Sequence, residues 1–175
     1  MKKLRKMFGD WQQPEIQALV KLIETQSKTT LVTWCVDYAE QHYLPIYEKE
    51  KPADKRPRKA LEKARAWLNK EIKLPEAKTA ILDCHTAARE AEKEPMIQAA
   101  ARAIGQAASS VHTATHALGI AFYGAAVTAY KEAGLEASDE VYEKIAAEEF
   151  VKIFNSLKSV AVKNEPNPIK VNWNC

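Results

Sequence analysis

Two histidines, His112 and His116, stand four residues apart in a run that carries no formal charge between Arg102 and Lys131. On a helix this spacing places both imidazoles on one face, one turn apart. Two imidazoles so placed can chelate a divalent metal if another element adds a ligand. Candidate third ligands are Asp37, Glu40, Asp83, Cys84 and His85. The alternative is a pair of buried polar rings that hydrogen-bond to neighbouring helices. We favour this alternative and expect neither a metal nor a cofactor.

A second group with potential chemistry is the run Asp83, Cys84 and His85. A nucleophilic Cys–His pair needs sulfur and imidazole within hydrogen-bond reach. Adjacent residues on a helix point about 100° apart, so Cys84 and His85 do not face each other. Cys84 lies on an apolar stripe typical of a core, and His85 stands at its edge, where it could face the histidine pair. Glycine-rich phosphate loops and nucleophile elbows do not occur, so we do not expect an enzyme.

The third group is ionic. Arg58, Glu62 and Arg65 follow one helical face, and Asp37 and Glu40 lie on the polar side of an earlier helix. Salt bridges between these two helices are the simplest use of such residues, and an arginine patch for an acidic partner is the alternative. The residues that we expect in a polar pocket or interface are Asp37, Glu40, Arg58, Arg65, His85, His112 and His116.

The elements that position these groups are predicted to be helices throughout, because Ala, Glu and Lys are abundant and the sequence has only five glycines. Start and stop signals divide the chain into about seven helices. The expected starts lie at Pro14, Ser27–Thr30, Asp54, Leu74–Pro75, Pro95, Ser109–Ser110 and Ser138. Pro45 is expected to kink or end the second helix. We find no strand pattern.

The uncharged segment from Ser110 to Tyr130 is expected to be the central helix, since a helix without charge on any side is normally surrounded by others. A single helix from Pro95 to Tyr130 would be about 50 Å long, more than the ~40 Å diameter of a domain of this size. We therefore place a break at 108–110, with a serine capping the second half. Gly134 should end the central helix.

The totals indicate one globular domain over residues 1–175, with an extended or loosely ordered tail over about 158–175. The net charge of +3 is uneven: residues 1–9, with Lys2, Lys3, Arg5 and Lys6, and the segment 49–65 are basic, and the remainder is acidic. A nucleic-acid binder would be more basic, and the apolar run is too short and polar for a membrane span.

Three widely spaced cysteines, of which Cys175 is the last, favour a reducing, cytoplasmic location.

Three stretches carry a resemblance to a known family. They read "TWCVDYAEQHYLPIYEKEKPADKRPRKALEKARAWLNKEI", "EAKTAILDCHTAAREAE" and "AAARAIGQAASSVHTATHALGIAFYGAAVTAY". Together they resemble the bacterial family of putative immunity proteins over roughly residues 31–133. The polar landmarks of that family map to Trp34, Asp37, Glu40, Pro45, Arg56, Arg58, Arg65, His85, Arg89, His112 and His116. Tyr38 departs from the family, where we expect cysteine, and this weakens any thiol-based chemistry.

The resemblance implies an all-helical protein, of the toxin–antitoxin kind, that binds a cognate toxin and blocks it by occlusion, without catalysis. We expect no nucleic-acid or membrane partner, and a homo-oligomer stays open. The alternative function is a helical metal- or small-ligand-binding protein, with an enzyme among the options, whose pocket would use Asp37, Glu40, His85, His112 and His116.

Overall fold

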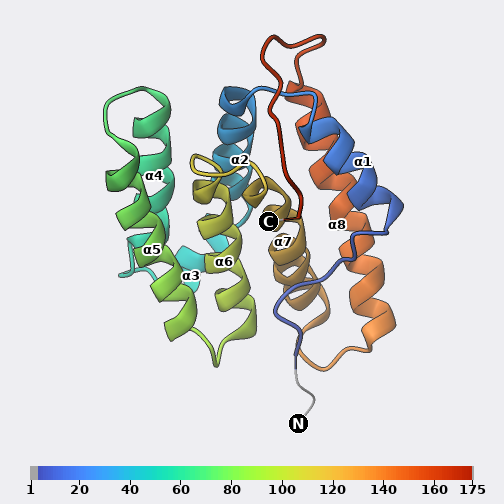
Figure 1. Ribbon diagram of the computed structural model, residues 1–175. Helices are drawn as coiled ribbons and strands as arrows, with labels where there is room; N and C mark the ends of the chain where they lie inside the picture. Colours follow the sequence, from blue (N-terminus) through green and yellow to red (C-terminus); the bar gives the residue numbers. More distant parts are fainter. Residues whose placement is uncertain (1–3, 175) are drawn as a thin grey trace.

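The computed structural model describes residues 4–174, and it confirms the all-helical bundle. These residues form eight helices and no strand: α1 (Pro14–Ile23), α2 (Lys28–His42), α3 (Leu44–Glu50), α4 (Arg56–Leu68), α5 (Leu74–Glu90), α6 (Pro95–Ser109), α7 (His116–Ala133) and α8 (Asp139–Val160). Figure 1 shows α4 and α5 on one side, α1 and α8 on the other, and α6 and α7 between them. No helix within residues 4–174 has the length and apolarity to cross a membrane.

Local signals decide where most helices begin. A proline stands in the first turn of α1, α3, α4, α5 and α6, where its missing N–H needs no partner. The hydroxyl of Ser27 accepts from the Thr30 N–H at 3.2 Å, and that of Ser138 accepts from Val141. Pro45 follows the end of α2 at His42 and lies in the first turn of α3, and this additional short helix raises the number from about seven to eight.

The centre of the bundle is the pair α6 and α7, which contact each other along their length and lie between α4–α5 on one side and α8 on the other. Most side chains on both are small and buried, so the two backbones approach closely. The expected central helix over 110–130 is corrected in its start, because residues 110–115 form a turn and α7 begins at His116. The break near 108–110 and the stop at Gly134, where φ is +70°, are confirmed.

The predicted serine cap of the central helix is wrong. The hydroxyl of Ser109 donates to the Gly105 carbonyl at 2.6 Å, and that of Ser110 donates to the Ala107 carbonyl at 2.6 Å. Both serine hydroxyls therefore bond back to carbonyls in the last turns of α6 and do not cap α7. Thr115 precedes α7 without a side-chain cap.

Both ends of the described chain pack on the bundle. Phe8 is buried, and its N–H donates to the Phe122 carbonyl at 3.1 Å. After α8 the chain has no helix and returns to the α1–α2 junction, where Glu165 accepts from the N–H and the hydroxyl of Ser27. Lys2, Lys3 and Cys175 lie outside the described residues. That residues 1–175 act as one domain remains a prediction.

Candidate binding site

The ionic group is assembled between α2 and α4. Arg65 on α4 donates to Asp37 at 2.7 Å and to Glu40, so the predicted salt bridges between these helices are confirmed for Arg65. Arg58 instead makes a two-bond contact with Glu48 of α3, at 2.7 and 2.6 Å. The hydrogen bond from Arg58 lowers the pKa of Glu48. All these arginines are partly exposed, and such pairs contribute at most about 1 kcal/mol each.

The histidine pair does not share a helical face. His112 lies in the turn before α7 and is exposed, and its carbonyl accepts a hydrogen bond from the Lys28 ammonium at 3.4 Å. His116 is the first residue of α7 and is partly buried. The expectation of two buried rings one turn apart is therefore wrong for His112, because the turn over 110–115 breaks the helical register.

His85 and His116 each contact a residue of α6, and these two residues, Arg102 and Gln106, lie one turn apart. Arg102 donates to Nδ1 of His85 at 3.1 Å, and His116 Nδ1 lies 2.8 Å from Oε1 of Gln106. Burial, followed by the positive charge of Arg102, lowers the pKa of His85 to about 4. Burial also lowers the pKa of His116. Both rings are thus neutral at pH 7 and join α5, α6 and α7 through hydrogen bonds.

A glycine makes room for the first of these rings. A Cβ on Gly105 of α6 would lie 2.6 Å from Cε1 of His85, closer than real Cβ contacts allow. Gly105 therefore lets the ring lie flat against α6. The contact explains why an alanine-rich helix carries a glycine in its middle.

The predicted polar residues form separate clusters. Asp37 and Glu40 contact Arg65, whereas His85 contacts Arg102 and His116 contacts Gln106. Within residues 4–174 no three His, Cys, Asp or Glu side chains gather closely enough to hold a metal ion. The shared pocket of the alternative function is not assembled in this structure.

Cys84 is a core residue, as predicted. Its thiol donates to the Ala101 carbonyl at 3.3 Å, and burial raises its pKa to about 12. Cys35 on α2 is also buried, and burial raises its pKa to about 12. Both thiols stay protonated at neutral pH and supply no thiolate nucleophile.

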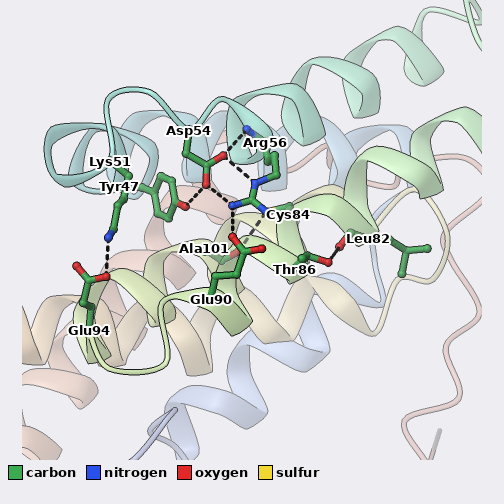
Figure 2. Close-up of polar contacts among 10 residues, drawn as sticks. All are labelled: Tyr47, Lys51, Asp54, Arg56, Leu82, Cys84, Thr86, Glu90, Glu94 and Ala101. Atoms are coloured by element: carbon green, nitrogen blue, oxygen red, sulfur yellow. Dashed lines mark hydrogen bonds and ion pairs between the residues drawn. The ribbon is translucent and has the colours of Figure 1, made fainter.

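A polar network that the sequence did not reveal joins α3, α4 and α5 (Figure 2). Asp54 accepts from the Tyr47 hydroxyl at 2.7 Å and from Arg56 through Nε at 2.9 Å and Nη2 at 2.7 Å. Arg56 Nη2 also donates to Glu90 of α5. The Arg56 guanidinium beside Asp54 lowers the pKa of that carboxyl to about 2. We call these four residues the Arg56 network.

The Arg56 network also contributes to the start of α4. Asp54 Oδ1 accepts the Arg56 N–H at 3.0 Å, so the predicted cap at Asp54 binds the first turn of α4. The network borders a small cavity of about 180 Å³. Every charged group in it meets an opposite charge from this chain, and this marks it as a structural junction of three helices.

A second feature missed from the sequence is a cleft with Glu149 in its wall, between α2, α3, α7 and α8. Its volume is about 370 Å³. The residues around it, which we call the Glu149 cleft, are Tyr38, His42, Tyr43, Ile46, Thr128, Lys131, Glu132, Glu149, Lys152 and Ser156. Glu149 is 4% exposed. The hydroxyls of Tyr38 and Tyr43 donate to its Oε1 at 3.1 and 3.2 Å.

The sequence did contain a signal for this position. Glu149 follows the helical period of the residues that α8 buries, between Ala146 and Ile153. A carboxylate on a buried stripe is unusual, because burial disfavours its charged form.

The backbone holds the tyrosines of the cleft in place. A Cβ on Gly124 of α7 would lie 1.9 Å from the Tyr43 hydroxyl oxygen, so the hydroxyl reaches Glu149 only because position 124 has no side chain. Burial, and then the charge of Glu149, raises the pKa of Tyr38 and of Tyr43. Both phenols therefore stay protonated and donate to the carboxylate.

Comparison with known proteins gives one finding. The model of a family described as Imm-5 like putative immunity protein matches residues 21–153, which is most of the chain and includes all of α2–α7, the end of α1 and most of α8. A search of curated proteins found no match, and a search of solved structures found none either.

Proposed function

Since the chain belongs to the Imm-5 like putative immunity protein family, we propose that it binds a cognate bacterial toxin domain and neutralises it by occlusion, without catalysing a reaction. The family match over residues 21–153 is the observation that carries this proposal. Immunity by occlusion needs only a surface complementary to the toxin. We place the protein in the cytoplasm, and the two free, buried cysteines, Cys35 and Cys84, agree with a reducing compartment.

The internal chemistry supports a binding role. The two thiols are protonated core residues, and His85 and His116 are engaged in hydrogen bonds between helices. We propose that these groups hold the bundle and that exposed residues meet the toxin. The exposed charges of α2 and α4 are the candidates, namely Asp37, Glu40, Arg58 and Arg65, together with His112 on the neighbouring turn.

This surface suits a charged partner. Arg65 bonds two carboxylates at once, and all three side chains are more than a third exposed. Exposed ion pairs are weak, so a partner can replace one of them at little cost. A toxin with a complementary charge would exchange the contacts within the protein for contacts across the interface.

The test uses the toxin gene that we expect beside this one. Expression of its toxin domain in a bacterial host should stop growth, and co-expression of this protein should restore it, with a 1:1 or multimeric complex in size-exclusion chromatography. Asp37→Lys with Glu40→Lys should weaken the complex. Asp83→Lys with Glu92→Lys, which reverses an exposed charge on α5 and another two residues after its end, is the matched control.

Measurements of folding show whether a weakened complex results from a changed interface or from an unfolded protein. Both double variants should keep the wild-type circular dichroism and melting temperature, so that a weakened complex reports the interface. If the wild type does not protect the host and does not bind the toxin domain, the proposed function is wrong. If both double variants bind equally well, the α2–α4 surface is not the interface.

A further inference from the structure

The Glu149 cleft contains a buried carboxylate that this chain does not neutralise. Glu149 makes no ion pair within residues 4–174, although Lys131 and Lys152 line the same cleft. Both lysines are exposed, so their ammonium groups keep their hydration. Charges buried in proteins are normally paired with an opposite charge or bound to a metal. The partner charge for Glu149 is therefore expected from outside the chain.

One oxygen of Glu149 is available for such a partner. Both tyrosine hydroxyls donate to Oε1, and the described residues provide no hydrogen bond to Oε2. No side-chain oxygen in the described residues is both fully buried and without a hydrogen bond. Oε2 must therefore be reached from the cleft, where it can accept from a bound group.

The walls of the cleft favour an organic cation. The rings of Tyr38 and His42 lie 4.2 Å apart between centroids, and Tyr43 completes an aromatic side next to the carboxylate. Aromatic faces attract ammonium and guanidinium groups and cover the alkyl chains that carry them. Partial loss of solvation lowers the pKa of His42, so its ring is neutral at pH 7 and does not itself act as the cation.

A metal ion fits the cleft less well. Within residues 4–174 no three His, Cys, Asp or Glu side chains gather around a common point, and a hard cation takes six or more oxygen ligands. The volume of about 370 Å³ is within the range of pockets for small organic ligands. It also accommodates one long side chain of a protein partner.

We propose that the Glu149 cleft binds an alkylammonium or alkylguanidinium group, with Oε2 of Glu149 as the acceptor and the rings of Tyr38 and His42 beside the alkyl chain. The cation site is independent of the immunity role. Its assignment to a lysine or arginine side chain of the toxin rests on the proposed function. Tyr38 and His42 lie on α2, the helix that also carries Asp37 and Glu40, so one partner can contact both regions.

The first experiment titrates the protein, labelled with ¹³C at its tyrosine rings, with n-butylguanidinium chloride. The ring signals of Tyr38 and Tyr43 should shift and saturate, with a Kd on the order of millimolar for so small a ligand. Neutral n-pentanol should cause no comparable shift. Glu149→Gln should weaken binding about ten-fold or more, whereas Glu132→Gln, at the rim of the same cleft, should change it less than about two-fold.

A second variant, Thr128→Lys, tests the same site if Glu149→Gln does not fold. Thr128 lines the cleft and is partly exposed. Thr128→Lys would place a cation of the chain itself beside Glu149 and should abolish binding of n-butylguanidinium. Shifts that persist in both variants, or that n-pentanol reproduces, would overturn the proposal.

The second experiment identifies the source of the cation. If the toxin inserts a side chain, Glu149→Gln and Thr128→Lys should each weaken the toxin complex about ten-fold or more. If the probe binds but the toxin complex is unchanged in both variants, the cation is a free amine or guanidine. If wild type neutralises the toxin but does not bind the probe, the cation site is wrong and the proposed function stands. If the probe binds and no toxin complex forms, the cation site stands and the proposed function is wrong.

Discussion

The Arg56 network and the Glu149 cleft are built from the same groups but differ in one charge. In both, tyrosine hydroxyls donate to a carboxylate that is largely removed from water. Asp54 also receives a guanidinium two residues along the chain, whereas Glu149 receives no cation within residues 4–174. A carboxylate that the chain neutralises joins helices, and one that it leaves unneutralised beside a cleft is available to a ligand.

The largest expected effect comes from opening the Arg56 network. Arg56→Gln would leave Asp54, whose side chain is 19% exposed, without its cation. We expect a loss of about 2–3 kcal/mol in the free energy of unfolding, measured by urea denaturation at pH 7. Arg58→Gln, which removes a more exposed pair with Glu48, should lose less than about 1 kcal/mol. Equal losses would show that the two arginines play the same role.

The next largest effect on stability is expected at Tyr43, which donates to Glu149 at the cleft and is itself part of the core. Gly124→Ala would place a Cβ against the hydroxyl of Tyr43, which is 1% exposed and has no room to move. Alanine favours a helix over glycine by about 1 kcal/mol, yet the clash should give a net loss of about 1–2 kcal/mol. In Gly119→Ala the new Cβ meets the end of the flexible Gln106 amide, so this control should lose less. A fully stable Gly124→Ala would contradict the packing of Tyr43.

A smaller effect on stability is expected from His85, a buried base that lies beside the positive charge of Arg102. The folded-state pKa of His85 is about 4, below the unfolded value of about 6.5, so the unfolded chain binds the proton more readily. The contribution of His85 is complete above pH 6.5, is lost as the pH falls from there towards 4, and is constant below that. From pH 7.5 to 6 the loss should be about 0.8 kcal/mol.

Denaturation of variants at the two pH values measures this contribution. His85→Asn should reduce the pH dependence, and His112→Asn, which changes an exposed ring in the turn, should not. NMR titration of wild type should show the His85 ring neutral at pH 6. A ring that titrates near pH 6.5 would mean that His85 is solvated and that Arg102 does not bear on it.

The smallest effect is expected at the Glu149 cleft. Glu149→Gln keeps an oxygen for the hydroxyls of Tyr38 and Tyr43 and removes a buried charge that has no ionic partner. Stability should stay within about 1 kcal/mol of wild type, since replacement of a poorly compensated buried charge is often neutral. Asp54→Asn should lose more, because it breaks an ion pair. A large loss in Glu149→Gln would indicate that the carboxylate has a structural role.

Most of the fold followed from short-range patterns. Prolines in first turns, the serine caps at Ser27 and Ser138 and the stop at Gly134 act within one helical turn, so the sequence could predict them. The turn over 110–115 was not predictable in this way. Its residues are uncharged and include no proline or glycine, and the serines that mark the break bond back to α6.

The candidate sites also include one that the sequence predicted and one that it could not predict. Asp37, Glu40 and Arg65 meet as predicted, because long charged side chains on exposed helix faces can reach one another over several registers. The Glu149 cleft could not be derived, since it joins residues about 110 positions apart in the sequence. Its geometry depends on Gly124, whose importance appears only when Tyr43 is seen against α7.

The sequence by itself thus determined the helical class, most helix ends, the core position of Cys84 and the family, all of which depend on local propensity, periodicity or shared tracts. The tertiary structure alone decided which carboxylates are neutralised by the chain. Asp54 and Glu149 are both acidic residues near tyrosines in a helical protein, and only packing places a guanidinium against the first and an open cleft against the second. The physical reason is that the energy of a buried charge depends on its neighbours in space, and helix packing sets those neighbours.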